Sequence, residues 1–112
     1  MLLDVCCGGD GFVYACARNG VLVRGKRGQW ETLELGDFSE SLWSLAWFEG
    51  CLYAASMDTV FVLGDDDLLA PVYMGEDRAK TCYDLVTGAG IMWSIGAKDV
   101  MSFDGQQWTR ID

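Results

Sequence analysis

A chain of 112 residues that is 51% hydrophobic and 12% aromatic has the size of one domain and is too apolar to remain disordered. Seventeen acidic against eight basic residues give a net charge of −9, which opposes binding to nucleic acid or an anionic membrane and favours a basic partner. No apolar run approaches the roughly 20 residues of a membrane span, so we expect a single soluble domain.

The first residues and the cysteines indicate the compartment. The segment from Met1 to Asp4 has no basic residue and reaches an acid before any hydrophobic stretch, so we expect no secretory signal and a cytoplasmic location. The five cysteines are odd in number and form no C-x-x-C pair, which argues against a disulfide framework and a zinc site. Buried reduced thiols are the expected state, and no metal or cofactor is predicted.

One pattern of short apolar runs occurs three times along the chain. Each copy has a glycine followed by an apolar strand with an aromatic residue at the third place, in 11–17, 50–56 and 90–96. The glycines are 39 and 40 residues apart. An internal repeat of this length is typical of propellers and other repeat folds.

Further runs give each copy four short strands. An apolar run precedes each glycine, and another begins seven residues after each aromatic, at Val21, Val60 and Val100. A last run closes each copy, degenerate in the middle one. Turn residues separate the runs and no helical periodicity appears. Both faces of these strands are apolar, which predicts sheets that are covered on both sides.

The first and third copies carry a recognisable turn before their last strand. The third copy reads Phe103-Asp104-Gly105-Gln106-Gln107-Trp108, and the first has a matching Gly28-Gln29-Trp30. Together with the repeat, this pattern resembles the blades of kelch and sialidase-repeat β-propellers over essentially the whole chain. The resemblance implies an all-β domain, 1–112, with antiparallel four-stranded blades at about 1–38, 39–78 and 79–112. It also implies structural roles for Asp104 and Trp108.

Three blades are fewer than the four to eight of typical closed propellers. Two chains joined head to tail would complete a six-bladed ring, so we predict a homodimer in which each chain forms half of the propeller. A larger ring, an open wedge and completion by another protein are the alternatives, in that order.

The chain offers little for catalysis. It has no histidine, which excludes Ser-His-Asp and Cys-His sites and histidine-based zinc hydrolases. A carboxylate pair for glycoside hydrolysis is not excluded, but no spacing singles one out. We expect a protein that is not an enzyme, with no catalytic, metal-binding or cofactor-binding residue.

Five residues are candidates for binding a partner: Phe48, Glu49, Asp65, Asp66 and Asp67. The three aspartates fall in a predicted hairpin turn, where they are either ordinary solvated acids, an electrostatic contact for a basic partner, or part of a cation site that would need further oxygen ligands. Phe48, beside the Glu49 turn, is placed near a rim, where an aromatic among acids could anchor a partner. Core packing between blades is the alternative for this phenylalanine.

In physical character, a small acidic protein without catalytic residues resembles bacterial immunity proteins, which occlude a toxin that is often basic. The predicted function is therefore a non-catalytic protein-binding module, specifically an immunity protein that neutralises a basic toxin. The alternatives are a structural or assembly subunit of a larger propeller complex, and a carbohydrate or small-molecule binder that uses the central channel.

Overall fold

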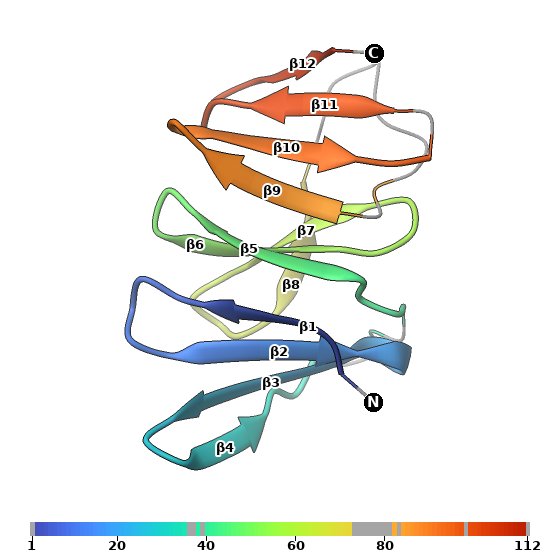
Figure 1. Cartoon of the computed structure of the whole chain (residues 1–112). Coiled ribbons are helices and arrows are strands. Elements are labelled where there is room, and N and C mark those ends of the chain that lie inside the picture. Colours follow the sequence, from blue (N-terminus) through green and yellow to red (C-terminus); the bar gives the residue numbers. More distant parts are fainter. Residues whose placement is uncertain are drawn as a thin grey trace.

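The structure is a computed structural model that describes residues 2–35, 38, 40–72, 82, 84–97 and 99–111. In this part of the chain, twelve strands form three four-stranded antiparallel sheets in which neighbours in sequence are neighbours in the sheet (Figure 1). The prediction of an all-β fold with three such sheets is confirmed. The sheets are named blade 1, blade 2 and blade 3 in chain order.

The strands are short, as their apolar runs predicted. Blade 1 contains β1 (Leu2–Cys7), β2 (Val13–Ala17), β3 (Val21–Lys26) and β4 (Gln29–Thr32). Blade 2 contains β5 (Ser44–Phe48), β6 (Cys51–Ala55), β7 (Val60–Leu63) and β8 (Leu69–Pro71). Blade 3 contains β9 (Asp84–Gly88), β10 (Ile91–Ile95), β11 (Val100–Phe103) and β12 (Trp108–Arg110).

Three hairpins share one kind of two-residue turn. Both turn residues have positive φ in Arg27-Gly28 (54° and 81°), Glu49-Gly50 (52° and 78°) and Ala89-Gly90 (53° and 77°). Two positive φ angles define the type I′ turn, whose twist matches that of antiparallel strands, and glycine takes the second place without a steric cost. Two of the three glycines that mark the repeat, Gly50 and Gly90, therefore have their place set by this turn.

The blades stack face to face in chain order, with β5 between β1 and β9 (Figure 1). Blade 2 is buried on both sides because its side chains alternate between the two neighbours. Leu45, Leu52 and Phe61 pack towards blade 1, while Ala46, Tyr53 and Val60 pack towards blade 3. This two-sided burial is what the apolar strands of the sequence predicted.

The outermost strand of blade 2 is short and ends in Pro71, which has no N–H to donate and suits an edge strand.

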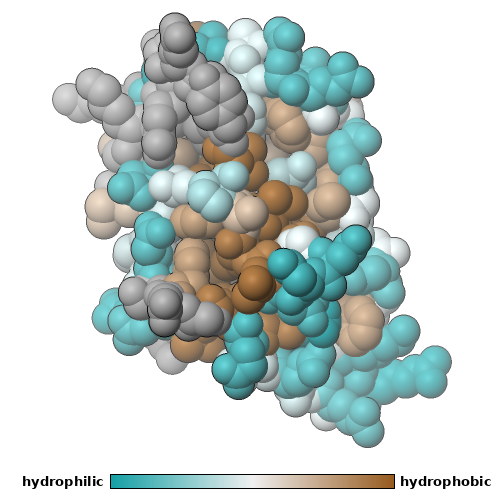
Figure 2. All heavy atoms as spheres, turned by 180° about the vertical axis from the view of Figure 1, so that it is seen from behind, coloured by the Kyte–Doolittle hydropathy of each residue, from teal (hydrophilic) through white to brown (hydrophobic). Residues whose placement is uncertain are grey.

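Figure 2 shows apolar residues gathered over the middle of the rear face, with hydrophilic residues around them. In blade 2, Leu68 is exposed and Leu63 and Leu69 are half-buried.

The register of the repeat differs from the prediction in the first copy. Tyr14 pairs with Arg24 ten residues later, whereas Tyr53 pairs with Val62 after nine. The β2–β3 connection is one residue longer and contains a 3-10 turn, Arg18–Gly20. The true counterpart of Val60 is therefore Leu22, and the expectation that Val21 held this place is wrong.

The five cysteines are unpaired, with Cys16 and Cys82 buried and Cys7 exposed. Reduced thiols were expected, although burial holds for only part of them. Within the described residues, no helix has the length and apolarity needed to span a membrane.

Candidate functional site

One end of the stack collects most of the hairpin turns. In an antiparallel blade, the turn after the first strand and the turn after the third lie at the same end. Figure 1 shows the β1–β2, β3–β4, β5–β6 and β9–β10 turns together on the left of the molecule. We call the carboxylates on the turns after the first and third strands of each blade the acidic rim; its described members are Asp10, Glu49, Asp65, Asp66, Asp67 and Asp104.

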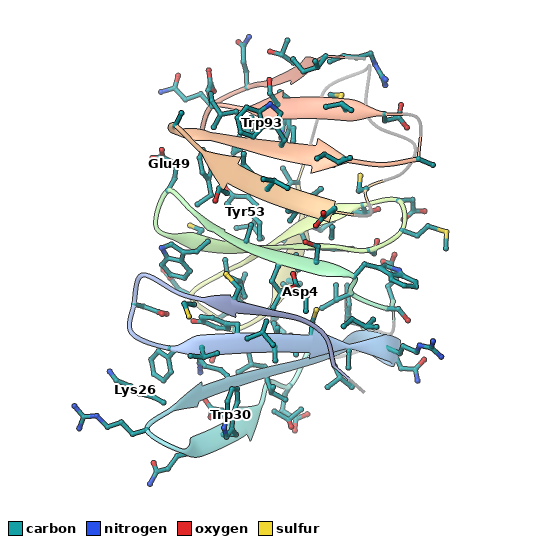
Figure 3. The ribbon with its side chains drawn as sticks, in the orientation of Figure 1. Asp4, Lys26, Trp30, Glu49, Tyr53 and Trp93 are labelled. Carbon is teal, nitrogen blue, oxygen red and sulfur yellow. The ribbon has the colours of Figure 1, made fainter. Side chains whose placement is uncertain are left out.

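Four of the five residues predicted from sequence lie on this rim. Glu49 occupies the exposed β5–β6 turn (Figure 3), and Asp65, Asp66 and Asp67 form the β7–β8 turn of the same blade. The fold thus brings two turns that are about 16 residues apart in sequence to one end of blade 2.

Phe48 does not point to the rim. It is 5% exposed, and its ring lies 5.8 Å from Phe103 and 6.3 Å from Tyr53 in the core between blades 2 and 3. Side chains of a strand alternate between its faces, and Phe48 shares the inward face of Ala46. The expectation of an exposed aromatic anchor at this position is corrected: Phe48 is a core residue.

The rim acids have different tasks. Asp66 Oδ1 accepts the N–H of Leu68 at 3.1 Å and so helps to shape the β7–β8 turn. Asp67 accepts two hydrogen bonds from the guanidinium group of Arg24, at 3.0 and 3.2 Å. Within the described residues, Asp65 and Glu49 make no hydrogen bond or ion pair, and their carboxylates face solvent. These two acids are available to a partner.

A cavity of about 270 Å³ opens beside the rim between blades 1 and 2. Asp10, Asp65 and Asp67 contribute its carboxylates, and Tyr14 and Trp47 its aromatic wall. The two rings are stacked, with centroids 6.3 Å apart and planes at 21°. An acidic cavity with an aromatic wall has the chemistry to receive a cationic side chain.

Tyr14 and Asp10 form a short hydrogen bond in this cavity. The phenol donates to Asp10 Oδ2 at 2.6 Å, and the other oxygen of Asp10 accepts the Phe12 N–H at 3.1 Å. Burial, reinforced by the bond to Asp10, raises the pKa of Tyr14 to about 12. The phenol therefore stays protonated and holds Asp10 in place.

Arg24 links blade 1 to blade 2 across the cavity. Besides Asp67, its guanidinium group donates to Glu31 Oε1 of β4 at 2.7 and 3.0 Å. Its bonds to Asp67 first, and to Glu31 second, raise its pKa above the ordinary value. Asp67 is thereby paired with a cation, whereas Asp10 and Asp65 have no cationic partner within the described residues.

No metal site is present in the described residues: no group of three or more acids or cysteines is placed to hold an ion. The three consecutive aspartates diverge, since Asp66 turns back to the backbone and Asp67 reaches Arg24. The sequence alternative of a cation site at this turn gains no support.

A second, larger cavity of about 760 Å³ has the opposite charge. Basic and aromatic side chains of blade 1 line it; among them, Lys26 and Arg24 each lie 5.2 Å from the centre of the Phe12 ring. Its other aromatic wall, Trp30, is exposed and lies over Gly25 on the open face of blade 1. This basic cavity is lined by blade 1 alone. The acidic cavity is formed by two blades and contains a predicted residue, Asp65, so we take it as the candidate site.

Sequence reasoning missed Asp10, Tyr14 and Arg24. Asp10 carries no signal beyond its place among turn residues, and Tyr14 is distinguished in the sequence only as the aromatic of the 11–17 strand. Arg24 carried a usable indication, because it is a charged residue that follows the apolar run 21–23 inside a strand. Such a residue needs an acidic partner from another element.

The fold is shared with a solved structure. The chain is similar to the crystal structure of the WD40 β-propeller domain of Doa1, with a TM-score of 0.71 and 17% identity over 96% of this chain and 38% of that one. At this identity the likeness shows the fold alone. The prediction of β-propeller blades is confirmed, whereas a kelch or sialidase-repeat type is not distinguished.

The sequence itself is similar to the Immune protein Tsi7 of Pseudomonas aeruginosa. The two are 47% identical over 112 residues, which is all of this chain and 36% of that protein. The chain thus spans about a third of the length of this relative. No protein-family model matches the chain.

Proposed function

We propose that this chain is a non-catalytic binding module with an immunity role, which occludes a basic surface of a toxin with its acidic rim. The observation that carries the proposal is the 47% identity to an immune protein across every part of the chain. The three blades correspond to about a third of that relative, so they are proposed to supply part of a toxin-binding surface. The predicted immunity role has its support in this match.

The rim supplies the proposed contact. Glu49 and Asp65 are exposed and unpaired within the described residues, and the cavity beside Asp65 would take a lysine or arginine side chain of the toxin. The Tyr14 and Trp47 rings would lie along that side chain, where a cation gains from an aromatic face. The net charge of −9 would speed the encounter with a basic partner.

The test is to capture the partner with variants of the rim. We expect Glu49→Gln combined with Asp65→Asn to weaken binding to the protein captured from the native host by about tenfold at low salt, since two exposed charge contacts are lost. The matched control is Glu34→Gln combined with Glu40→Gln, which removes two exposed acids away from the rim. Isothermal titration at low and high salt measures both.

The control variant should bind like the wild type at every salt concentration. Equal binding by both double variants, or binding by the wild type that does not weaken with salt, would show that the rim is not the contact.

Two further parts of the proposal concern the oligomeric state of the chain and its cellular compartment. We propose that two copies of the 112-residue chain close a six-bladed ring, as the deficit of blades predicts. We also propose that the module acts in the cytoplasm. The alternatives of an assembly subunit and a channel-binding module have no contact in the described residues that favours them.

A further inference from the structure

The basic cavity of blade 1 lies next to the acidic cavity, and one side chain stands between them. Arg24 lines both cavities. Its guanidinium group is already occupied by acids, because it donates to Glu31 Oε1 and to both carboxylate oxygens of Asp67. A group bound in one cavity would therefore have a group bound in the other as its neighbour.

The Lys26 side chain belongs to the face of the β3–β4 hairpin that is turned towards blade 2. Side chains alternate along a strand, so Lys26 lies on the same face as Arg24. From this face Arg24 reaches Asp67 of blade 2. Trp30 pairs with Gly25, which lies between the two cations in sequence, and so belongs to the opposite face. Lys26 is therefore not part of the outer face of blade 1.

The Lys26 ammonium group is held in place without an acid. Its Nζ lies 5.2 Å from the centre of the Phe12 ring, a distance at which a cation is attracted to an aromatic face. It also lies 3.3 Å from the place that a Cβ on Gly11 would take, so the glycine leaves room for it. A side chain that is already positioned loses less conformational freedom when it binds a partner.

The bases of this cavity are concentrated and partly unpaired. Arg24, Lys26 and Arg27 are three of the eight basic residues of the chain and fall within four positions. Lys26 and Arg27 are exposed and have no acidic partner within the described residues, while the carboxylate of the cavity wall, Glu31, is bound to Arg24. In a chain with seventeen acids, two neighbouring cations without a partner indicate a place for an anion from outside.

This positive region adjoins the acidic rim. Figure 3 shows Lys26 at the same end of the molecule as Glu49. Gly11, against which the Lys26 ammonium lies, directly follows Asp10 of the rim. The end of the molecule that carries the turns is thus negative over blade 2 and positive at the edge of blade 1.

We propose that the basic cavity receives a carboxylate side chain of the toxin, beside the cationic side chain that the acidic cavity receives. This contact rests on the proposed immunity function and deepens it, because it requires a toxin surface that carries an acid next to a base. Paired contacts of both signs fix the orientation of two proteins, since a shift of register brings like charges together.

The sign of a charge effect separates this contact from general attraction to a basic toxin. General attraction alone would make Lys26→Glu bind more tightly to the protein captured from the native host, because the variant is more negative. The proposed carboxylate contact makes Lys26→Glu bind about tenfold more weakly, and Lys26→Gln more weakly by a smaller factor. Isothermal titration measures both, and circular dichroism checks that each variant is folded.

The matched controls are Arg18→Glu and Arg18→Gln. Arg18 is an exposed base in the connection between β2 and β3, which lies at the other end of the blade. These variants carry the same charge changes away from the cavity, so they should bind as tightly as the wild type or slightly more tightly.

A charge exchange identifies the partner group. Each exposed acid of the captured protein is changed to lysine in turn. At least one of these changes should weaken binding of the wild-type chain and restore binding of Lys26→Glu, because the ion pair is then rebuilt with its signs reversed.

Unchanged or tighter binding by Lys26→Glu would overturn the carboxylate contact, and so would the lack of any restoring change. Either result leaves the immunity proposal standing if Glu49→Gln combined with Asp65→Asn still weakens binding. A captured protein that does not arrest growth would instead refute the immunity role, so the two failures are distinguishable.

Discussion

Among single residues, Tyr14 shows how the packing of two blades sets an electrostatic property. Its phenol is buried between blades and bonded to a carboxylate, so ionisation would place two negative charges 2.6 Å apart. That is the physical reason for its pKa of about 12 against an ordinary value of about 10. The neutral form is favoured in the folded chain more than in the unfolded one.

This raised pKa predicts a pH dependence. The contribution of Tyr14 to stability is complete below about pH 10 and is lost as the pH rises towards 12, because the unfolded chain releases the proton first. Urea unfolding of the wild type should therefore show a steeper loss of stability over this range than Tyr14→Phe. Parallel curves for the two proteins would contradict the assignment.

Residue positions were easier to predict from sequence than side-chain directions. The turns at Glu49 and at the three aspartates follow from glycine and charge, and both lie where they were expected. The direction of the Phe48 side chain depends on which face of β5 packs against blade 3. That choice is set by tertiary packing and cannot be derived from the local sequence. The bridge from Arg24 to Asp67 joins residues 43 positions apart, so sequence offers no pairing for it.

Among the strands, the contact between β5 and β9, the first strands of blades 2 and 3, depends on Ser44. Its buried hydroxyl accepts from Leu85 and donates to Asp84, so both of its capacities are used. Ser94 is equally buried, but its hydroxyl has no partner in the described residues. Two serines of the same burial thus differ in hydrogen bonding alone.

Alanine at each position should separate these two cases. Ser44→Ala should lower the free energy of unfolding by about 1–3 kcal/mol because it leaves the buried Leu85 amide unpaired. Ser94→Ala should be neutral or slightly stabilising, since it removes an unpaired buried hydroxyl. Urea unfolding at one protein concentration compares them, and equal losses would show that this hydrogen bond does not hold the junction.

The repeat was predictable as a series of strands because turn glycines and apolar runs are local. The extra residue between β2 and β3 was not, because Val21 and Leu22 are both apolar and either could begin the strand. Only the pairing of Tyr14 with Arg24 decides between them. The hydrophobic pattern specifies strand register when only one face is apolar. Both faces of these strands are apolar, so the pattern does not specify it here.

At the scale of the whole molecule, the main feature is the number of blades in the described residues, which is three. Three blades cover 38% of a WD40 propeller chain and 36% of an immune protein. The match therefore defines a three-bladed unit, and the rest of each of these longer proteins lies outside it.

Neutralisation of a toxin is the decisive measurement for the immunity role. The protein captured by the acidic rim is produced in a susceptible bacterium, alone and together with this chain, and growth is measured. We expect that the captured protein alone arrests growth, that the wild type restores it, and that Glu49→Gln combined with Asp65→Asn restores it less well than Glu34→Gln combined with Glu40→Gln. A captured protein that is harmless, or arrest that the wild-type chain does not relieve, would contradict the immunity role.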